Sequence, residues 1–364
     1  MIPYLILLQA VEDPQSFQAE HINRLFNQFN IAAAGILLLV LFLVIYVTTK
    51  FRRRQGDDSE GAPITGNRRV ETLMIGFPTV LLAWFFYKTL AVSAAVMPPV
   101  QASRQPDVII TGHQFWWEVS YPRPTGSPGP ASSIGSSGAG STSNSSSSAN
   151  SSGPANSSGL PGSPSPASSA DYVITANEVH LPVGRTLLLE LRSADVVHDW
   201  WVPQLGNKMD LVPGNKNYLW VTIRRPGDYI GACSEFCGQE HAWMRIRVVA
   251  QQPQDFDRWL DSNARDAAPP TDDLARQGEA LFLTRTCAGC HRIRGTPAIG
   301  AAGPDLTHLG NRSTILTGLL TTSEEDLTKW INHPQEIKQG SYMPDFMFGK
   351  DSLRAIAHYL EQLK

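Results

Sequence analysis

The chain has 364 residues and a formal net charge of −3, from 30 basic and 33 acidic side chains. This length is sufficient for two or three domains, and a charge so close to neutral gives no electrostatic support for binding nucleic acid. The four cysteines form two close pairs, Cys233 with Cys237 and Cys287 with Cys290. Because no cysteine is left for a structural disulfide, both pairs are candidates for metal or cofactor binding.

Two long apolar runs within the first hundred residues predict a membrane anchor. Residues 31–49 are almost wholly apolar and uncharged, and residues 72–97 are interrupted by a single lysine. Each run is long enough to span a bilayer. Two such runs in tandem are not typical of buried core helices. We therefore expect a transmembrane helical hairpin over residues 31–97, preceded by an N-terminal segment, residues 1–30, on the outer side of the membrane.

Basic residues in the loop 50–71 predict the orientation of this hairpin. Positively charged residues in a short loop mark the cytoplasmic side, and this loop has six: Lys50, Arg52, Arg53, Arg54, Arg68 and Arg69. Both termini, and everything after residue 98, should then lie outside the cytoplasm. The apolar run within residues 1–10 makes a poor signal peptide, because no basic residue precedes it.

The region 98–253 has the pattern of an all-β domain. Residues 107–121 are β-rich and contain the cluster Gly112-His113-Gln114-Phe115-Trp116-Trp117. Residues 124–170 are almost entirely small and polar without a charged side chain, which predicts a disordered insert within the domain. Short strand patterns with intervening turns then predict an antiparallel sandwich: residues 172–175, 178–181, 186–191, 217–223, 227–232 and 244–249.

A metal-binding pattern lies between the last two of these strands. Cys233 and Cys237 are followed by His241 and then by Met244. Thiolate and thioether are soft ligands that favour copper, and two cysteines on one loop can bridge two copper ions. Zinc is the alternative, because Cys-x3-Cys followed by His is close to zinc-ligand spacings. His198, at the end of another strand pattern, would supply a second imidazole, although a lone histidine there is more often a packing residue.

The metal loop and the His198 segment together closely resemble subunit II of haem-copper cytochrome c oxidases. The resemblance implies a cupredoxin-like fold in which Cys233 and Cys237 bridge the two coppers of a CuA centre. It divides the remaining ligands between the coppers: His198 and Met244 on one, His241 and the backbone carbonyl of Glu235 on the other. It also implies a bacterial inner membrane as the location, with the redox domains in the periplasm.

The aromatic cluster also resembles this family, in which it lies over the copper centre. Phe115, Trp116 and Trp117 would then lie on the path of electrons, but Phe115 stands where the family commonly has a tryptophan. That departure puts the family's usual route for incoming electrons in doubt. Without the resemblance, such aromatic side chains most often serve packing.

Two further sites follow only from the resemblance. Lys208 and Asp210 match positions near a magnesium site at the interface with subunit I, where the Glu235 carboxylate would be this chain's main ligand. By itself, the segment with Lys208 and Asp210 is a charged turn. Glu71 matches an acid at the mouth of a proton channel in the partner subunit. By itself, it is an ordinary acid at a helix start, where the helix dipole favours it.

The last part of the chain, residues 271–364, has the pattern of a second redox domain. Residues 254–270 precede it as a short helix and a Pro-rich linker. Cys287-x-x-Cys290-His291 is the attachment signature of a c-type haem, although the pentapeptide alone could be a redox dithiol. With its flanking helical segments the region resembles a class I cytochrome c from end to end. The resemblance implies that Met343, with Met347 as its competitor, is the distal haem ligand and that the Pro304 carbonyl orients His291.

This combination predicts a multidomain membrane protein: a helical hairpin, a cupredoxin-like sandwich and an all-α cytochrome c domain. It resembles subunit II of caa-type oxidases, which implies electron transfer from haem c to CuA and on to subunit I, where a proton-translocating complex reduces oxygen. The implied partners are subunit I, further oxidase subunits, the lipid bilayer, and cytochrome c or another upstream donor. Two alternatives are the electron-input subunit of a nitric oxide reductase and a membrane-anchored copper-handling protein with a haem domain.

Overall fold

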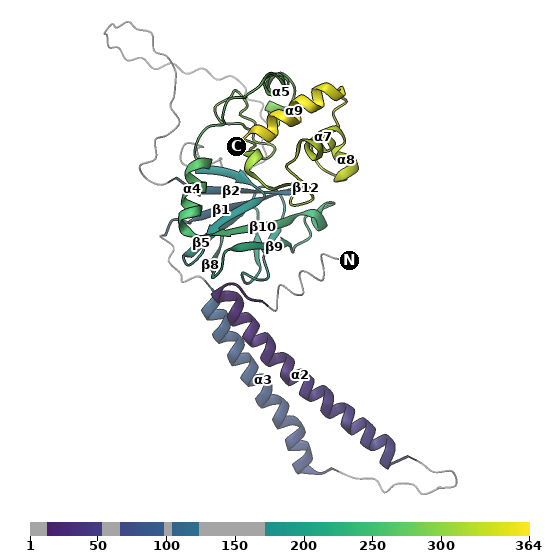
Figure 1. Cartoon of the computed structure of the whole chain (residues 1–364). Helices are drawn as coiled ribbons and strands as arrows, with labels where there is room; N and C mark the ends of the chain where they lie inside the picture. Colours follow the sequence, from purple (N-terminus) through teal and green to yellow (C-terminus); the bar gives the residue numbers. More distant parts are fainter. Residues whose placement is uncertain (1–12, 53–65, 98–103, 124–171) are drawn as a thin grey trace, which may run out of the picture.

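The computed structural model describes residues 13–52, 66–97, 104–123 and 172–364. The predicted apolar start, the tip of the loop between the two apolar runs and the insert 124–170 lie outside the described residues. Figure 1 shows three parts in a row: a pair of long helices, a β-sandwich and a helical C-terminal domain on the far side of the sandwich.

The two long helices are α2 (Phe17–Lys50) and α3 (Arg68–Val96). Both are long and apolar enough to cross a membrane, and most of their apolar side chains are exposed, as lipid contact requires. α2 begins well before the predicted span, because the Ser16 side chain caps its first turn by accepting from Ala19 N. The polar first turns of α2 pack against the sandwich, where Gln18 accepts from the backbone N–H of Thr222.

Two five-stranded sheets form the sandwich. In the first sheet the strand order is β3-β2-β1-β5-β8, with bounds Tyr172–Ala176, Trp116–Pro122, Val108–His113, Thr186–Ser193 and Asn217–Thr222. In the second it is β4-β10-β9-β6-β7, with bounds Glu178–Pro182, Arg245–Gln251, Gly227–Cys233, His198–Trp201 and Met209–Leu211.

The sandwich is mixed, so the prediction of an antiparallel sandwich is wrong for two pairs of strands. β1 pairs parallel with β5, and β4 pairs parallel with β10. The alternation of apolar residues shows which face of a strand is buried, but it does not show the direction of the neighbouring strand. The segment predicted as a charged turn contains β7, which is only three residues long and too short for a clear period.

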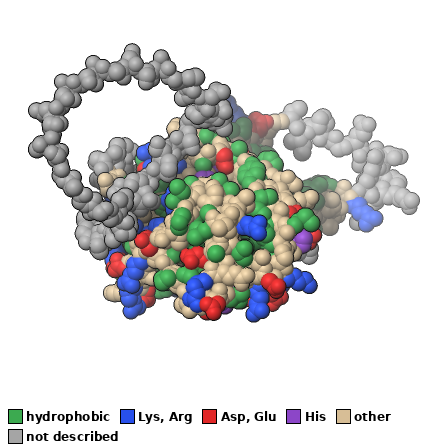
Figure 2. Space-filling model, turned by 90° about the horizontal axis from the view of Figure 1, so that it is seen from above, with side chains coloured by type: hydrophobic (Ala, Val, Ile, Leu, Met, Phe, Trp, Pro, Cys, Tyr) green, Lys and Arg blue, Asp and Glu red, His purple; other side chains and the backbone are tan. Residues whose placement is uncertain are grey.

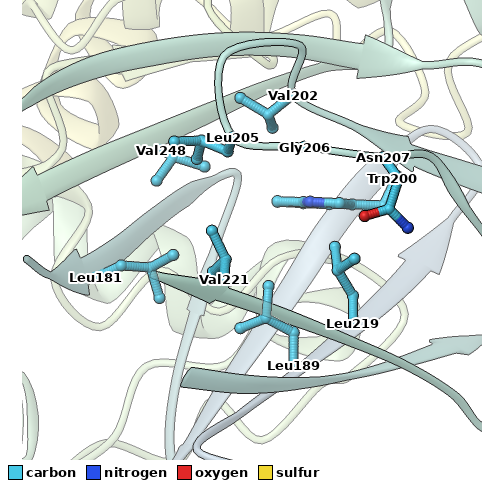
Figure 3. Close-up of a pocket in the computed structure, with 10 residues that line it drawn as sticks. All are labelled: Leu181, Leu189, Trp200, Val202, Leu205, Gly206, Asn207, Leu219, Val221 and Val248. Atoms are coloured by element: carbon cyan, nitrogen blue, oxygen red, sulfur yellow. The ribbon is translucent and has the colours of Figure 1, made fainter. Parts of the chain in front are cut away.

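The core lies between the sheets. β10 alternates buried and half-buried residues along its whole length, which is the period of a strand with one face inward. Figure 3 shows apolar side chains from both sheets converging, among them Leu189 of β5 and Val248 of β10. The cavity that they leave is only about 10 Å³, so the frame of the sandwich is closely packed.

A short helix, α4 (Pro253–Asn263), leads to the C-terminal domain. This domain contains α5 (Asp273–Thr284), α6 (Cys287–Cys290), η2 (Leu309–Asn311), β11 (Thr314–Ile315), β12 (Leu320–Thr321), α7 (Glu324–Asn332), α8 (Pro334–Ile337) and α9 (Lys350–Gln362). α5 starts directly after Asp272, whose side chain caps the helix by accepting from Ala275 N at 2.8 Å. The helices surround a second, separate core that includes Phe282 and Tyr359.

Candidate metal centre and haem cavity

The strands bring the predicted metal ligands to one end of the second sheet. His198 is the first residue of β6, and Cys233 is the last residue of β9. β6 and β9 are neighbours in the sheet, with Trp200 opposite Cys233. The chain then forms a loop with one short helical turn, η1 (His241–Trp243), before Met244 leads into β10. Residues far apart in the sequence therefore meet on a rigid frame.

The side chains at this end form one compact set of donors. The Sγ atoms of Cys233 and Cys237 are 3.8 Å apart. The Nδ1 atom of His198 lies 3.9 Å from Cys233 Sγ, and that of His241 lies 3.7 Å from Cys237 Sγ. Two further donors complete the set: Met244 Sδ at 3.8 Å from Cys237 Sγ, and the Glu235 carbonyl oxygen at 3.3 Å from Cys233 Sγ. The structure thus brings together all six predicted ligand positions.

The two thiols cannot easily both ionise without a cation between them. The hydrogen bond with Cys237 lowers the pKa of Cys233 to about 4, whereas hydrogen bonding to Cys233 raises the pKa of Cys237 above its ordinary value. The reason is that two thiolates at 3.8 Å repel each other. Bound metal removes this repulsion. Soft sulfur donors with two imidazoles therefore fit copper, and two sulfurs at this spacing fit a bridged pair.

A carboxylate that the sequence did not single out orients His198. Asp195 Oδ1 lies 2.8 Å from His198 Nε2, leaving Nδ1 directed at the sulfurs. Its other oxygen accepts from the backbone N–H of Gln114 at 2.7 Å. A carboxylate behind a ligating histidine fixes the tautomer and the ring orientation. The three-residue spacing between Asp195 and His198 was the signal available in the sequence.

The aromatic cluster divides into three different positions. Trp117 is fully buried in the sandwich and donates from Nε1 to the Arg245 carbonyl, so its place is that of a core residue. Trp116 stacks on His113 with ring centroids 4.2 Å apart and lines the large cavity described below. Phe115 is buried, lines the same cavity and also touches the metal loop, because a Cβ at Gly238 would lie only 3.0 Å from its ring.

The remaining predicted sites are more exposed or incomplete. Lys208 Nζ lies over the Trp201 ring at 4.6 Å, and Asp210 is the cross-strand neighbour of Asp199. Burial, with the hydrogen bond that protonated Asp199 donates to the Asp210 carboxylate, raises the pKa of Asp199 to about 7. Among the residues that the structure describes, neither Glu235 nor Asp210 belongs to a cluster of three candidate ligands. Glu71 is exposed in the first turn of α3.

A second candidate site is a cavity of about 380 Å³ in the C-terminal domain. Its lining is mainly apolar, with Phe282, Leu306, Ile331 and Leu360 among the residues, and it includes all of the residues predicted to hold the haem: Cys287, Cys290, His291, Pro304 and Met343. An apolar cavity with a few convergent polar groups is the usual form of a cofactor site. One wall belongs to the sandwich domain, from residues Gln114, Phe115, Trp116, Asn177 and Glu240.

The donors in this cavity fit a haem. His291 Nδ1 lies 2.8 Å from the Pro304 carbonyl oxygen, and burial lowers the pKa of His291, which keeps the imidazole neutral. Gly303 leaves room for that ring, because a Cβ there would lie 2.6 Å from His291 Cε1. Met343 is half-buried and lines the cavity, whereas Met347 is fully exposed and is not among the lining residues.

Arg312 is a functional candidate that no motif in the sequence indicates. It is only 8% exposed and lines the cavity, and one guanidinium nitrogen donates to the Asp305 carbonyl. Its Nε atom is buried and has no hydrogen-bond partner among the described residues. A buried cation with an unused donor fits an anionic group in the cavity. The chain has many arginines, and nothing in the sequence distinguishes this one from those on the surface.

Comparison with known proteins gives the same architecture. The family model described as "Cytochrome C oxidase subunit II, transmembrane domain" matches residues 5–91, the one described as "Cytochrome C oxidase subunit II, periplasmic domain" matches 159–251, and "Cytochrome c" matches 275–364. Cytochrome c oxidase subunit 2 of Alkalihalophilus pseudofirmus is 30% identical over 364 residues, covering 97% of this chain and 90% of the relative.

Proteins with the same name in two Bacillus strains are also similar over most of their length. The one from Bacillus sp. PS3 is 27% identical and covers 86% of this chain and 80% of its own. The one from Bacillus subtilis 168 is 23% identical and covers 93% of this chain and 88% of its own. These similarities confirm the family that the motifs predicted. The chain belongs to the cytochrome c oxidase subunit II family, as a membrane protein with two transmembrane helices, a periplasmic cupredoxin-like domain and a C-terminal cytochrome c domain.

Proposed function

We propose that this subunit carries two one-electron relays, a dinuclear copper centre on the sandwich and a covalent haem in the C-terminal domain. The copper ligands are His198, Cys233, the Glu235 carbonyl, Cys237, His241 and Met244. Cys287 and Cys290 would attach the haem, and His291 and Met343 would be its ligands. The observation that carries the proposal is the convergence of six donors, with neighbouring atoms 3.3–3.9 Å apart, at one end of a packed sheet.

When bound, both groups supply one-electron uptake and release without making or breaking a substrate bond. The residues around them favour this role. The β6, β9 and β10 frame holds the copper ligands in one geometry, and Asp195 fixes the His198 ring. Little rearrangement of the ligands is then needed when a bound cofactor gains or loses an electron. His291 and Met343 would both serve as haem ligands, so this chain is not expected to bind oxygen. Oxygen reduction is therefore the task of the catalytic partner, subunit I.

The haem cavity also contains groups for the rest of the cofactor. We assign Arg312 as the donor to a haem propionate, since its buried Nε has no other partner among the described residues. The Pro304 carbonyl accepts from His291 Nδ1, so that Nε2 is the free imidazole nitrogen. Leu306, Ile331 and Leu360 exclude water from the ring.

The wider setting is part of the same proposal. The hairpin lies in a bacterial inner membrane with both termini and both redox domains in the periplasm, because the basic loop marks the cytoplasmic side. The partners are subunit I and further subunits of a proton-translocating oxidase, together with cytochrome c or another upstream donor. Glu235, Lys208 and Asp210 would contribute to a magnesium site only with ligands from subunit I, and Glu71 would lie at the mouth of that subunit's proton channel.

The proposed order of the relays can be tested in the purified oxidase. A light-activated external donor should reduce the covalent haem first, and the near-infrared absorbance of the copper pair should then change at the rate at which the haem is reoxidised. The Met343→Leu variant, which should lower the haem potential, should shift the electron further toward copper at equilibrium, without removing copper. A haem that is reoxidised at the same rate in a copper-free complex would contradict the order.

A further inference from the structure

We propose that the cytochrome domain is docked on the copper domain in one fixed position, with Lys338 as its anchor and the Gln114–Tyr342 pair as the direct contact between the two cofactor sites. The inference rests on the proposed copper and haem ligands. It goes beyond them. By itself, a linker such as residues 254–270 would only tether the cytochrome domain and raise its effective concentration at the copper domain, without fixing its position.

Lys338 is the strongest sign of a fixed position. It belongs to the cytochrome domain, just after α8 (Pro334–Ile337), yet its side chain is only 6% exposed. Its Nζ atom lies 2.8 Å from Glu240 Oε2 and donates to the Phe115 carbonyl at 2.9 Å. Both partners are part of the copper domain, and the Glu240 side chain is 1% exposed. A buried charge of this kind is tolerated only while its partner is in place.

A second anchor lies around Glu178 of β4. This carboxylate is buried, and its Oε1 accepts from the backbone N–H and the hydroxyl of both Ser313 and Thr314, at 2.6–3.2 Å. Arg247 of β10 pairs with the same carboxylate at 3.0 Å and donates to the Ser313 hydroxyl. Four hydrogen bonds from one short segment to one carboxylate oxygen demand a defined orientation. Two anchors at separate points therefore set the angle of docking as well as the distance.

A third contact, close to the copper loop, supports this orientation. Thr317 donates from its hydroxyl to the Trp243 carbonyl. Leu316 and Thr317 have φ angles of 54° and 57°, in the left-handed region that non-glycine residues rarely adopt. Such conformations persist where the surrounding structure determines them, and they gather at functional contacts.

Gln114 connects the two cofactor sites through one side-chain amide. Its Nε2 donates to the carbonyl of Cys237 at 2.6 Å, and its Oε1 accepts from the Tyr342 hydroxyl at 2.8 Å. Cys237 is a proposed copper ligand, and Tyr342 directly precedes the proposed haem ligand Met343. The Phe115 ring lies beside this connection, 6.2 Å from the centroid of Tyr342. We assign Gln114 and Tyr342 as positioning residues for electron transfer between the domains.

Docking in this position has a consequence for the external electron donor. The copper-domain edge formed by Gln114, Phe115 and Glu240 is covered by the cytochrome domain. A donor must then deliver its electron to the cytochrome domain. Figure 2 views the end of the molecule away from the membrane helices, where basic and acidic side chains lie close together between hydrophobic ones.

The anchor can be tested by hydrogen exchange of the complete oxidase, loaded with copper and haem. In Lys338→Met, exchange of the peptides that contain Phe115, Glu240 and Thr317 should rise about tenfold or more, because Glu240 is left buried and unpaired. The matched control is Lys329→Met, which removes an exposed ion pair with Glu325 on the same domain and should leave these peptides unchanged. Unchanged exchange in Lys338→Met, with haem and copper still present, would overturn the proposal.

Two further variants protect the test against a folding defect. Lys338→Met combined with Glu240→Gln removes both charges and should restore part of the protection, as expected for an interacting pair.

Tyr342→Phe keeps the ring of an exposed residue and loses only the hydroxyl. It should lower the rate of electron transfer from haem to copper severalfold while both optical spectra stay as in the wild type. An unchanged rate would remove Gln114 and Tyr342 from the path. If the wild-type protein itself contained no copper or no haem, that result would instead contradict the proposed function.

Discussion

The two cofactor sites are built in different ways. The copper site takes its donors from adjacent strands of one sheet and a single loop, and neighbouring donor atoms lie within 4 Å of one another. The proposed haem site would take its ligands from two distant segments, Cys287–His291 and Met343, which line a cavity to which a different domain contributes one wall. The first site depends on the local backbone frame. The second depends on how helices and domains pack.

This difference leads to different expected responses to mutation. Removing a donor from the copper site leaves an incomplete ligand set on a frame that cannot easily move. Changing the haem site should produce graded effects, because two thioether bonds hold the haem even when an axial ligand is weakened. Substitutions at the two sites should therefore differ in effect, from complete loss of a cofactor to a small change in stability.

Cys237→Ser should abolish the paired-copper signal while leaving the haem attached. Serine cannot replace the soft bridging thiolate, and Cys237 Sγ lies 3.7 Å from His241 Nδ1 and 3.8 Å from Met244 Sδ. Electron paramagnetic resonance and the haem absorbance of the same sample would measure both outcomes. A mixed-valence copper spectrum that survives in this variant would show that Cys237 is not a ligand.

Met343→Leu should keep the haem bound but lower its reduction potential and change its spectrum. The reason is that a thioether ligand on haem iron raises the potential. Met347→Leu is the matched control, because Met347 is fully exposed and should have no effect. If the two variants behave in the opposite way, Met347 is the axial ligand.

Glu178→Gln should weaken the contact between the domains and leave both cofactors in place. The variant replaces a carboxylate that is held by Ser313, Thr314 and Arg247, and we expect a loss of about 1–3 kcal/mol in docking free energy. The control is Glu190→Gln, which removes another buried carboxylate of the sandwich, one paired with Arg192 and Lys216. Hydrogen exchange of the peptide with Ser313 should rise only in Glu178→Gln.

The contact that Glu178 makes between the domains should weaken only at low pH. Burial favours the neutral form of Glu178, but hydrogen bonds from His180 and Ser313 and the charge of Arg247 outweigh it and lower its pKa to about 2. Since the pKa is depressed, its contribution is present above the ordinary value of about 4.5 and is lost as the pH falls toward 2. Loss of docking already at neutral pH would show that this carboxylate is not ionised.

The smallest effect should be a pH dependence of the stability of the cytochrome domain. Hydrogen bonding to Asp272 raises the pKa of His358, and Glu324 adds to this effect. A raised pKa means that the stabilisation is complete below the ordinary histidine value of about 6.5 and is lost as the pH rises through the value in the folded state. The melting temperature should therefore fall slightly between about pH 5.5 and about pH 8.5, and His358→Gln should remove this difference.

The sequence predicted the copper site more completely than its surroundings. Cys233, Cys237, His241 and Met244 are close in sequence, and their spacing carries the chemistry. Lys338 and Glu240 are paired only because two domains pack together, and nothing in either segment indicates the other. The same reason explains why the parallel pairing of β1 with β5 was missed. Local patterns determine ligand sets and elements, whereas contacts between distant segments follow from the fold.

Phe115 illustrates this limit most clearly. In the sequence, Phe115 stands where the family commonly has a tryptophan, which puts the family's usual electron route in doubt. In the fold its ring lies between the metal loop and the haem cavity. Its carbonyl accepts from Lys338, and the neighbouring Gln114 accepts from Tyr342, so this position faces the chain's own cytochrome domain.

The most direct test of the account is the metal and haem content of the full-length protein, measured together with its electron paramagnetic resonance spectrum. We predict two copper ions that share one unpaired electron, and one covalently bound haem, per chain. A single copper ion with the spectrum of an isolated site, or zinc in its place, would contradict the proposed ligand set of His198, Cys233, Cys237, His241 and Met244.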